Sequence, residues 1–330
     1  VRTFNRSAHV GFQLGTNYVA VAVDGIDFAV VVKQHAEVVD VPLHLVVLPW
    51  SGDFLACEAL QPFVEWKKQL GYDMVEYYPS YAANRDTIKA ELTKMYNSRT
   101  PLSPAPTFLL IVGDVEQIHS FIGKYTIPGG ETHATDLYYA EYTGDIYPDV
   151  LFGRMSVRNT GELQNVINKT IAYEQYCIAD TTNLNKALLV AGKENRTPAP
   201  TVTNGMLNYI KTTLNTDFGM DTIVYYNPTS YDKRDEILLQ LSTNPGFVNY
   251  TGHCTTAGWS SPTIGVTDIA TLPMEGKYSF VVNNCCKSNN FTIGECFGEA
   301  LMRKENGGAI GVIGASNETL WNEDYYWGVG

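Results

Sequence analysis

The sequence lacks several features that would assign it at once to a functional class. It has fewer basic than acidic residues, 23 Lys and Arg against 35 Asp and Glu, and its formal net charge is −12. Nothing in it supplies the basic groove that nucleic acid requires, so we expect no nucleic-acid partner. The negative charge instead favours basic ligands.

Long apolar runs and metal-binding motifs are also missing. The longest apolar stretch, residues 18–32, is interrupted by Asp24 and Asp27 and cannot span a membrane. There is no His-Glu-x-x-His motif and no matched pair of Cys-x-x-Cys motifs, which removes the commonest zinc sites. The six cysteines are too scattered to form a disulfide scaffold.

The ends of the chain carry no recognisable signal. No secretory signal peptide precedes Val1, so we expect a mature or trimmed product, and the abrupt end at Gly330 predicts that the natural precursor continues. With 330 residues, 45% of them hydrophobic, the chain can bury a large core in two domains or one large α/β unit.

The order of expected elements predicts an α/β fold with mainly parallel sheets flanked by helices. Residues 1–44 form a β-rich lead-in segment. Residues 45–180 form a first α/β subdomain, in which a helix begins at Pro62 and ends at Gly71. Residues 181–330 form a second, catalytic α/β subdomain that is incomplete at its C-terminus. The glycines of residues 307–314 lie within a strand, which argues against a dinucleotide site.

Two apolar strands of the second subdomain end on chemically reactive residues. One ends at His253 and Cys254, and the other at Cys285 and Cys286. Because the carboxyl ends of neighbouring parallel strands open onto one crevice, His253 is expected to lie within reach of a cysteine. An imidazole beside a thiol can remove its proton and stabilise the thiolate. The alternative is that these cysteines are small core residues.

A third strand ends on a carboxylate. Residues 188–194 form an apolar strand that ends at Glu194, at the same expected edge of the sheet. A carboxylate there would orient the imidazole of a Cys–His pair. The alternative is a solvated acidic residue in a loop.

Several segments, taken in order, resemble the gingipain family of secreted cysteine endopeptidases, and most closely its lysine-specific member. The resemblance runs from about residue 45 to the end of the chain. The segments that carry it are residues 136–139, 153–156, 249–253, 284–286, 296–303 and 316–327.

The resemblance implies a caspase-like fold with two subdomains and a Cys–His–acid site. The family's nucleophile matches Cys286, its general base matches His253, and its orienting acid falls on Glu194. The oxyanion hole would use the backbone N–H groups of Cys286 and Cys254. The family normally has Gly where this chain has Cys254, and a donor that needs a glycine-only conformation would be misaimed.

The resemblance also implies where a basic substrate side chain binds. Asp324 falls at the base of the primary pocket, with Trp321, Thr251 and Asn284 along its walls. A carboxylate below an apolar wall suits the ammonium and methylene groups of Lys, although it can also accept Arg. We therefore expect protein or peptide substrates with basic residues, and a secreted or cell-surface location in bacteria.

The family also binds calcium, which would be a structural ion; no organic cofactor is expected. Asp145 and Asp149 offer carboxylate oxygens on either side of the Tyr147 carbonyl, a spacing that suits a hard cation. Asp114 is a further candidate ligand. The alternative is an ordinary acidic turn.

Three rival functions stay open. The protein could cleave after Arg instead of Lys, or it could be a catalytically impaired homologue that only binds proteins, with Cys254 as the damaging change. A metal site built from Cys254, Cys285 and Cys286 is the third, and it needs at least one more soft ligand.

Overall fold

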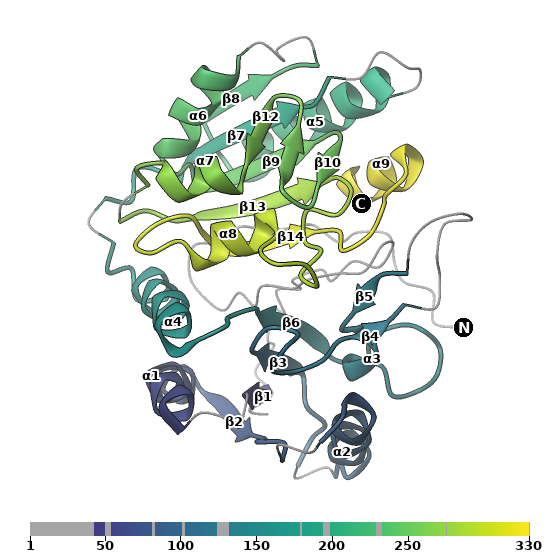
Figure 1. Cartoon of the computed structure of the whole chain (residues 1–330). Helices are drawn as coiled ribbons and strands as arrows, with labels where there is room; N and C mark the ends of the chain where they lie inside the picture. The colour runs from purple at the N-terminus through teal and green to yellow at the C-terminus, as the bar shows by residue number, and fades with distance from the viewer. Residues whose placement is uncertain are drawn as a thin grey trace.

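Two parallel β-sheets, each flanked by helices, form most of the described part of the chain (Figure 1). The structure is a computed structural model that describes residues 43–49, 54–80, 83–100, 103–123, 132–178, 180–193, 199–228, 233–274 and 276–329. The predicted α/β class is confirmed. The predicted lead-in segment, residues 1–44, lies outside the described residues except for its last two positions.

The first sheet has four strands in the order β2-β1-β3-β6, all parallel. The strands are β1 (Leu43–Pro49), β2 (Tyr72–Glu76), β3 (Phe108–Val112) and β6 (Leu151–Met155). Helices α1 (Phe54–Gln69) and α4 (Thr160–Glu174) pack on one face, and α2 (Arg85–Asn97) and α3 (Leu137–Ala140) on the other. Short strands β4 (Phe121–Ile122) and β5 (Ala134–Thr135) pair beside it.

The second sheet has five parallel strands in the order β14-β13-β9-β7-β8. They are β7 (Lys186–Ala191), β8 (Thr222–Tyr226), β9 (Phe247–Thr251), β13 (Ser279–Asn284) and β14 (Ala309–Gly314). One face is covered by α6 (Arg234–Ser242), α7 (Val266–Thr271) and α8 (Phe297–Arg303), and the other by α5 (Ala199–Thr216) and α9 (Trp321–Val329).

A small antiparallel sheet follows β9 and forms the rim of the second sheet. Its strands are β10 (Cys254–Thr255), β11 (Gly258–Ser260) and β12 (Thr263–Gly265). Tyr250 at the end of β9 stacks on Trp259 of β11, with ring centroids 4.4 Å apart. This stacking fixes the rim against the main sheet.

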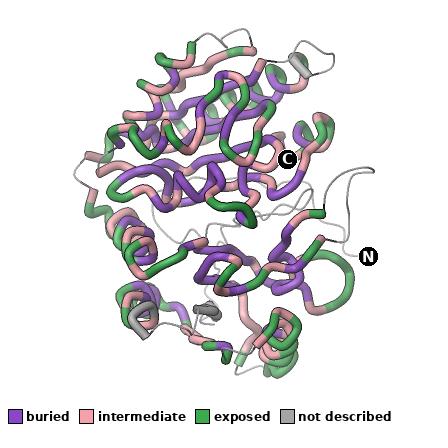
Figure 2. The backbone as a smooth tube through the Cα atoms, in the orientation of Figure 1, coloured by how far each residue is buried: buried purple, intermediate pink, exposed green. Residues whose placement is uncertain are grey.

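Buried residues concentrate along the strands of both sheets, and exposed residues lie on the outer surfaces of the helices (Figure 2). Parallel strands that are covered on both faces read as continuous apolar runs, as residues 108–112 and 187–191 do. The same runs carried the sequence-based prediction of these strands.

One predicted boundary is wrong. Pro62 was expected to begin a helix, but it lies inside α1, which begins eight residues earlier at Phe54. Leu60, Phe63 and Val64 all pack into the core between α1 and the first sheet. Their burial outweighs the loss of one backbone hydrogen bond at the proline.

A buried ion pair explains two of the segments that carried the family resemblance. The guanidinium of Arg154 in β6 binds both carboxylate oxygens of Asp136, each at 2.7 Å, and also donates to the carbonyl of Gly113 at 2.7 Å. Both side chains of the pair are almost completely buried. These segments therefore hold the first sheet to the loop that precedes α3.

The last strand of the first sheet lies before residue 180 and the first strand of the second sheet lies after it. The predicted subdomain boundary at 180/181 agrees with this arrangement but stays a prediction. Helix α4 packs on α1, α8 and β14, and so lies between the two sheets.

Candidate active site

The register of two neighbouring strands brings the predicted base and nucleophile to one place. Strands β9 and β13 are adjacent and parallel, and Thr251 is paired with Asn284 at their carboxyl ends. His253 and Cys286 each lie two residues beyond that pair. The predicted strand-end arrangement is therefore present in the fold.

A disulfide joins the segments that carry these two residues. Cys254, which follows His253, is bonded to Cys285, which precedes Cys286, and their Cα atoms lie 5.4 Å apart. This pair was not predicted from the sequence, since the two cysteines are 31 residues apart and become neighbours only when β9 pairs with β13.

The disulfide also overturns the alternative of a three-cysteine metal site. Two of its three sulfur atoms are bonded to each other, so only Cys286 of the three keeps a thiol. Within the described ranges, no group of three or more His, Cys, Asp or Glu side chains is placed to hold a metal ion.

The thiol of Cys286 is half-buried and contacts one residue of the loop before α9. The backbone N–H of Thr319 donates to its Sγ at 3.3 Å, and the hydroxyl of Thr319 lies 3.7 Å from the same atom. Thr319 was not among the predicted site residues, and only its place within the 316–327 segment pointed towards it.

His253 is exposed at the rim, where its backbone is well anchored. Its carbonyl accepts hydrogen bonds from the Tyr250 hydroxyl at 2.8 Å and from the Ser260 N–H at 2.9 Å. Its ring lies edge-on to the indole of Trp321, with centroids 5.3 Å apart. The predicted base and one predicted pocket wall are therefore in contact.

Glu194 lies outside the described residues, so its predicted role stays a prediction. The strand that leads to it, β7, ends beside β9, and the N–H of Gly192 donates to the Thr251 carbonyl at 2.7 Å. A Cβ at Gly192 would lie 3.0 Å from the Gly252 Cα and 2.6 Å from the Tyr250 hydroxyl, so only glycine fits this close approach. Gly192, two residues before Glu194, therefore lies against Gly252, the residue before His253.

The two predicted oxyanion donors lie on either side of the disulfide. Because the Ser260 N–H donates to the His253 carbonyl, Cys254 and Trp259 form a non-hydrogen-bonded pair and the N–H of Cys254 points away from β11. The N–H of Cys286 donates to no other backbone group of the described residues. Cys254 does not adopt the positive φ that would require glycine, so its side chain does not misaim the donor on that ground.

Asp324 lies in the first turn of α9 and is buried, with 6% of its surface exposed. Burial raises the pKa of its carboxyl to about 7, against the lowering effects of the Thr319 hydroxyl and His253. The Thr319 hydroxyl donates to Asp324 Oδ2 at 3.0 Å. One residue thus contacts both the candidate nucleophile and the candidate specificity carboxylate.

Asn284 and Thr251, the other predicted pocket residues, make different contacts near this site. The Asn284 side chain donates to the Asp324 carbonyl at 3.1 Å, so it holds α9 in place. The Thr251 side chain is fully buried and bonds Asn249 at 3.1 Å, so it lies beneath the site. Their predicted contact with substrate stays a prediction.

The predicted calcium ligands form a hydrogen-bonded turn. Asp149 Oδ2 accepts the N–H groups of Tyr142 and Thr143 at 2.6 and 3.0 Å, and Asp145 Oδ1 accepts the N–H of Tyr147 at 3.1 Å. These bonds are those of an acidic turn that needs no ion. The carboxylate oxygens of Asp145 and Asp149 are already hydrogen-bonded, so they fit a calcium ion poorly, and the calcium site stays a prediction.

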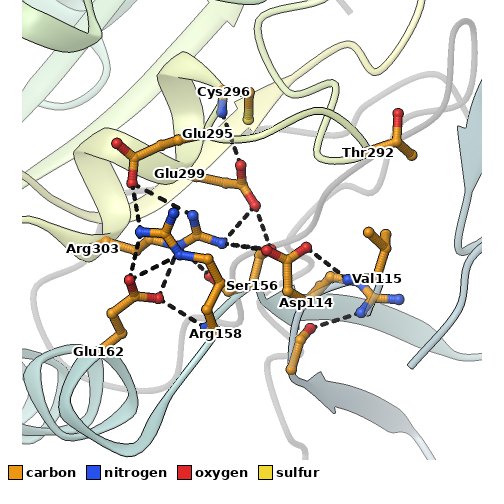
Figure 3. Close-up of polar contacts among 12 residues, drawn as sticks. Asp114, Val115, Ser156, Arg158, Glu162, Thr292, Glu295, Cys296, Glu299 and Arg303 are labelled. Carbon is orange, nitrogen blue, oxygen red and sulfur yellow. Dashed lines mark hydrogen bonds and ion pairs between the residues drawn. The ribbon is translucent and has the colours of Figure 1, made fainter. Parts of the chain in front are cut away.

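Asp114, the further candidate calcium ligand, is held instead by Arg303. The guanidinium of Arg303 binds Asp114 at 2.8 Å and Glu299 at 2.8 Å, and also approaches Glu162 at 3.3 Å (Figure 3). This cluster joins the loop after β3 and helix α4, both beside the first sheet, to α8, which covers the second sheet. The cluster was not predicted from the sequence.

Helix α8 also contacts both segments that carry the reactive residues. The N–H of Phe297 donates to the Thr256 carbonyl at 2.9 Å, and the N–H of Gly298 donates to the Ser288 carbonyl at 3.0 Å. The helix therefore positions the rim after His253 and the turn after Cys286 together.

Cys286 and His253 both follow the carboxyl ends of adjacent parallel strands, an arrangement typical of a cysteine-dependent hydrolase of the α/β class. The model of peptidase family C25 matches residues 42–328. The chain belongs to this family.

Similar proteins agree with that assignment. Lys-gingipain HG66 and Lys-gingipain W83, both from Porphyromonas gingivalis, are each 33% identical over 91% of this chain. The chain spans only 17% of the length of these curated relatives.

Among solved structures, one titled "Structure of Protease" is 32% identical, with a TM-score of 0.79 over 90% of this chain and 64% of that chain. The Arg-specific cysteine proteinase gingipain R (RgpB) is 23% identical, with a TM-score of 0.69 over 86% of this chain and 65% of its own, and it supports the fold alone.

Proposed function

We propose that the protein is a cysteine endopeptidase that cleaves protein or peptide substrates after basic residues, and after Lys in preference to Arg. The observation that carries the proposal is the register of β9 and β13, which places His253 and Cys286 two residues beyond a paired Thr251 and Asn284. Membership of peptidase family C25 and similarity to Lys-gingipain support the same class of reaction.

In the proposed mechanism, His253 takes the thiol proton and Cys286 Sγ attacks the scissile carbonyl carbon. The carbonyl oxygen becomes an oxyanion, which the N–H groups of Cys254 and Cys286 stabilise. His253 then protonates the leaving amine, which departs as the tetrahedral intermediate collapses to a thioester. A water molecule, deprotonated by His253, hydrolyses the thioester and restores the thiol. Glu194 is assigned the role of orienting the imidazole.

The preference for Lys over Arg rests on the state of Asp324. One of its oxygens already accepts the Thr319 hydroxyl. A guanidinium binds best through two parallel bonds to both carboxylate oxygens, whereas an ammonium is a point charge that needs only one. The remaining oxygen therefore suits Lys, and the apolar face of Trp321 suits its methylene groups.

A secreted or cell-surface location is part of the proposal. A disulfide such as Cys254–Cys285 persists in oxidising compartments and is rare in reducing ones. No helix of the described part of the chain is long and apolar enough to cross a membrane.

The test compares three matched reporter peptides that end in Lys, Arg or Leu, with a mild reductant to keep Cys286 reduced. We expect cleavage of the Lys peptide to be lost in Cys286→Ala and unchanged in Cys177→Ala, a matched control because Cys177 is an exposed free thiol. Cleavage by Cys286→Ala would refute the mechanism. Preference for the Arg peptide would keep the mechanism and change the specificity, and no cleavage of any peptide would favour a homologue that only binds proteins.

A further inference from the structure

The Cys254–Cys285 disulfide connects the two halves of the proposed catalytic machinery. Each of its cysteines is the immediate neighbour of a proposed catalytic residue: Cys254 of His253 and Cys285 of Cys286. Each cysteine also adjoins a proposed oxyanion donor. One donor is the backbone N–H of Cys254 itself, and the other is the N–H of Cys286, which shares a peptide group with the Cys285 carbonyl. No other covalent bond of the described residues joins the β9 and β13 segments.

Without the disulfide, the segment after His253 is held only by non-covalent contacts. Strand β10 is two residues long and pairs only with β11. The remaining ties are the stacking of Trp259 on Tyr250 and hydrogen bonds, such as those from Phe297 to the Thr256 carbonyl and from the Trp259 indole to the Asn283 side chain. By contrast, Cys285 is completely buried and its N–H bonds the Asn283 carbonyl at 2.9 Å. The disulfide thus adds a covalent link, directly beside His253, between the rim and a buried part of the core.

Catalysis by such a site depends on small distances between groups on the two segments. A change far from the reacting atoms that misplaces them by about 1 Å can lower the rate about a hundredfold. Loss of one oxyanion donor lowers the rate about 10²–10³-fold. A covalent link between the residues next to these groups limits that displacement.

We propose that the Cys254–Cys285 disulfide is a positioning clasp that holds His253 and the two oxyanion donors in register with Cys286. This inference rests on the proposed peptidase function. It means that the active form needs one thiol reduced, that of Cys286, and one disulfide intact at the adjacent residue. It also gives Cys254 a role, where the sequence alone suggested damage.

The first measurement maps the cysteines without using activity. Non-reduced protein is alkylated, digested and analysed by mass spectrometry. We expect a peptide pair linked through Cys254 and Cys285, with alkylation of the exposed Cys177 and the half-buried Cys286. Absence of the linked pair would overturn the clasp whether or not the protein cleaves peptides.

The second measurement uses the double variant Cys254→Ala/Cys285→Ala, which leaves no new thiol beside Cys286, with Cys177→Ala as the matched control. At a temperature where circular dichroism shows both variants folded, we expect kcat for the Lys peptide to fall about tenfold to a hundredfold, with KM within about twofold of wild type. The control keeps the wild-type values. A folded double variant with unchanged kcat would overturn the proposal.

A third measurement decides the case in which the double variant does not fold. Wild-type protein is treated with increasing dithiothreitol, which reduces the disulfide to two thiols and is itself oxidised to the cyclic disulfide. We expect activity to rise at low concentration as Cys286 becomes reduced, and to fall when mass spectrometry detects alkylated Cys254 and Cys285. Activity is measured on one portion of each sample before a second portion is alkylated, and full activity in a sample whose second portion shows both Cys254 and Cys285 alkylated would overturn the clasp.

The two proposals fail in different ways. If wild-type protein cleaves no peptide while the linked pair is present, the peptidase function fails, and with it the purpose of the clasp. If wild-type protein cleaves the Lys peptide and the folded double variant does so with the same kcat, only the clasp fails.

Discussion

Asp324 is the proposed specificity residue, and its burial in the fold alters its ionisation. Its carboxyl has a pKa of about 7 because it is buried, so the group is neutral below that pH and anionic above it. An ammonium is attracted only to the anion. We therefore expect kcat/KM for the Lys peptide to fall below about pH 7, by up to about tenfold for each pH unit.

The proposed reaction also needs the Cys286 thiolate, so the contribution of that group to the pH profile has to be measured separately. The alkylation rate of Cys286 by iodoacetamide reports the thiolate without involving Asp324. Loss of Lys-peptide cleavage at a pH where alkylation is still fast would assign the effect to Asp324. A pH profile of kcat/KM that follows alkylation at every pH would contradict it.

Thr319 links the thiol to Asp324, and its hydroxyl lowers the pKa of the Asp324 carboxyl. We expect Thr319→Val to raise that pKa, moving the midpoint of the Lys-peptide profile to higher pH and lowering kcat/KM at pH 7 about five- to tenfold. Thr319→Ser keeps the hydroxyl and should restore the wild-type midpoint. Equal midpoints for all three proteins would remove Thr319 from this role.

At the scale of elements, α8 joins the candidate site to the loop that follows β3 of the first sheet. Its first residues bond the segments after His253 and after Cys286, and its last residue, Arg303, binds Asp114 and Glu299. Burial raises the pKa of the Glu299 carboxyl although Arg303 lowers it. Arg303 is therefore the cation that stabilises several buried carboxylates at once.

We expect Arg303→Ala to lower the free energy of unfolding by about 3–5 kcal/mol, because it leaves buried carboxylates without their cation. Arg158→Ala is the matched control: Arg158 pairs with Glu162 and Glu295 of the same cluster, but 43% of its side chain is exposed. Its loss should cost about 1 kcal/mol or less. Urea unfolding measures both, and equal effects would contradict the importance of burial at Arg303.

At the scale of the whole molecule, Lys169 joins α4, beside the first sheet, to the loop between α8 and β14 of the second sheet. It is buried on α4, and its ammonium donates to the carbonyls of Lys304 and Gly307 at 3.3 and 3.2 Å. Burial, and secondarily the charge of Lys304, lower its pKa to about 7. The folded state therefore binds this proton less tightly than the unfolded state, and this group's contribution to stability is lost as the pH falls towards 7.

We expect Lys169→Met to gain stability relative to wild type as the pH falls from about 10 to about 7, by about 1.4 kcal/mol for each pH unit at most. Lys211→Met is the control, since Lys211 lies on an exposed position of α5. Urea unfolding at several pH values gives the difference. A difference that does not change with pH would show that Lys169 titrates normally.

Much of the fold could be predicted from the sequence because the relevant signals are local. Apolar runs such as residues 108–112 and 187–191 are strands in the structure. The end of a strand is also a local feature of the sequence, so the sequence alone predicts that His253 and Cys286 lie at strand ends. Pro62 was misplaced because a local rule was outweighed by the packing of Leu60, Phe63 and Val64.

The sequence by itself determined the α/β class, the family and the residue types that carry the chemistry, because periodicity and motifs are properties of consecutive residues. The tertiary structure decided which strand ends meet. Adjacency of β9 and β13 depends on the whole sheet, and only that adjacency places Cys254 against Cys285, 31 residues away. Contacts such as Thr319 with Cys286, and Arg303 with Asp114, likewise join residues that no local pattern relates.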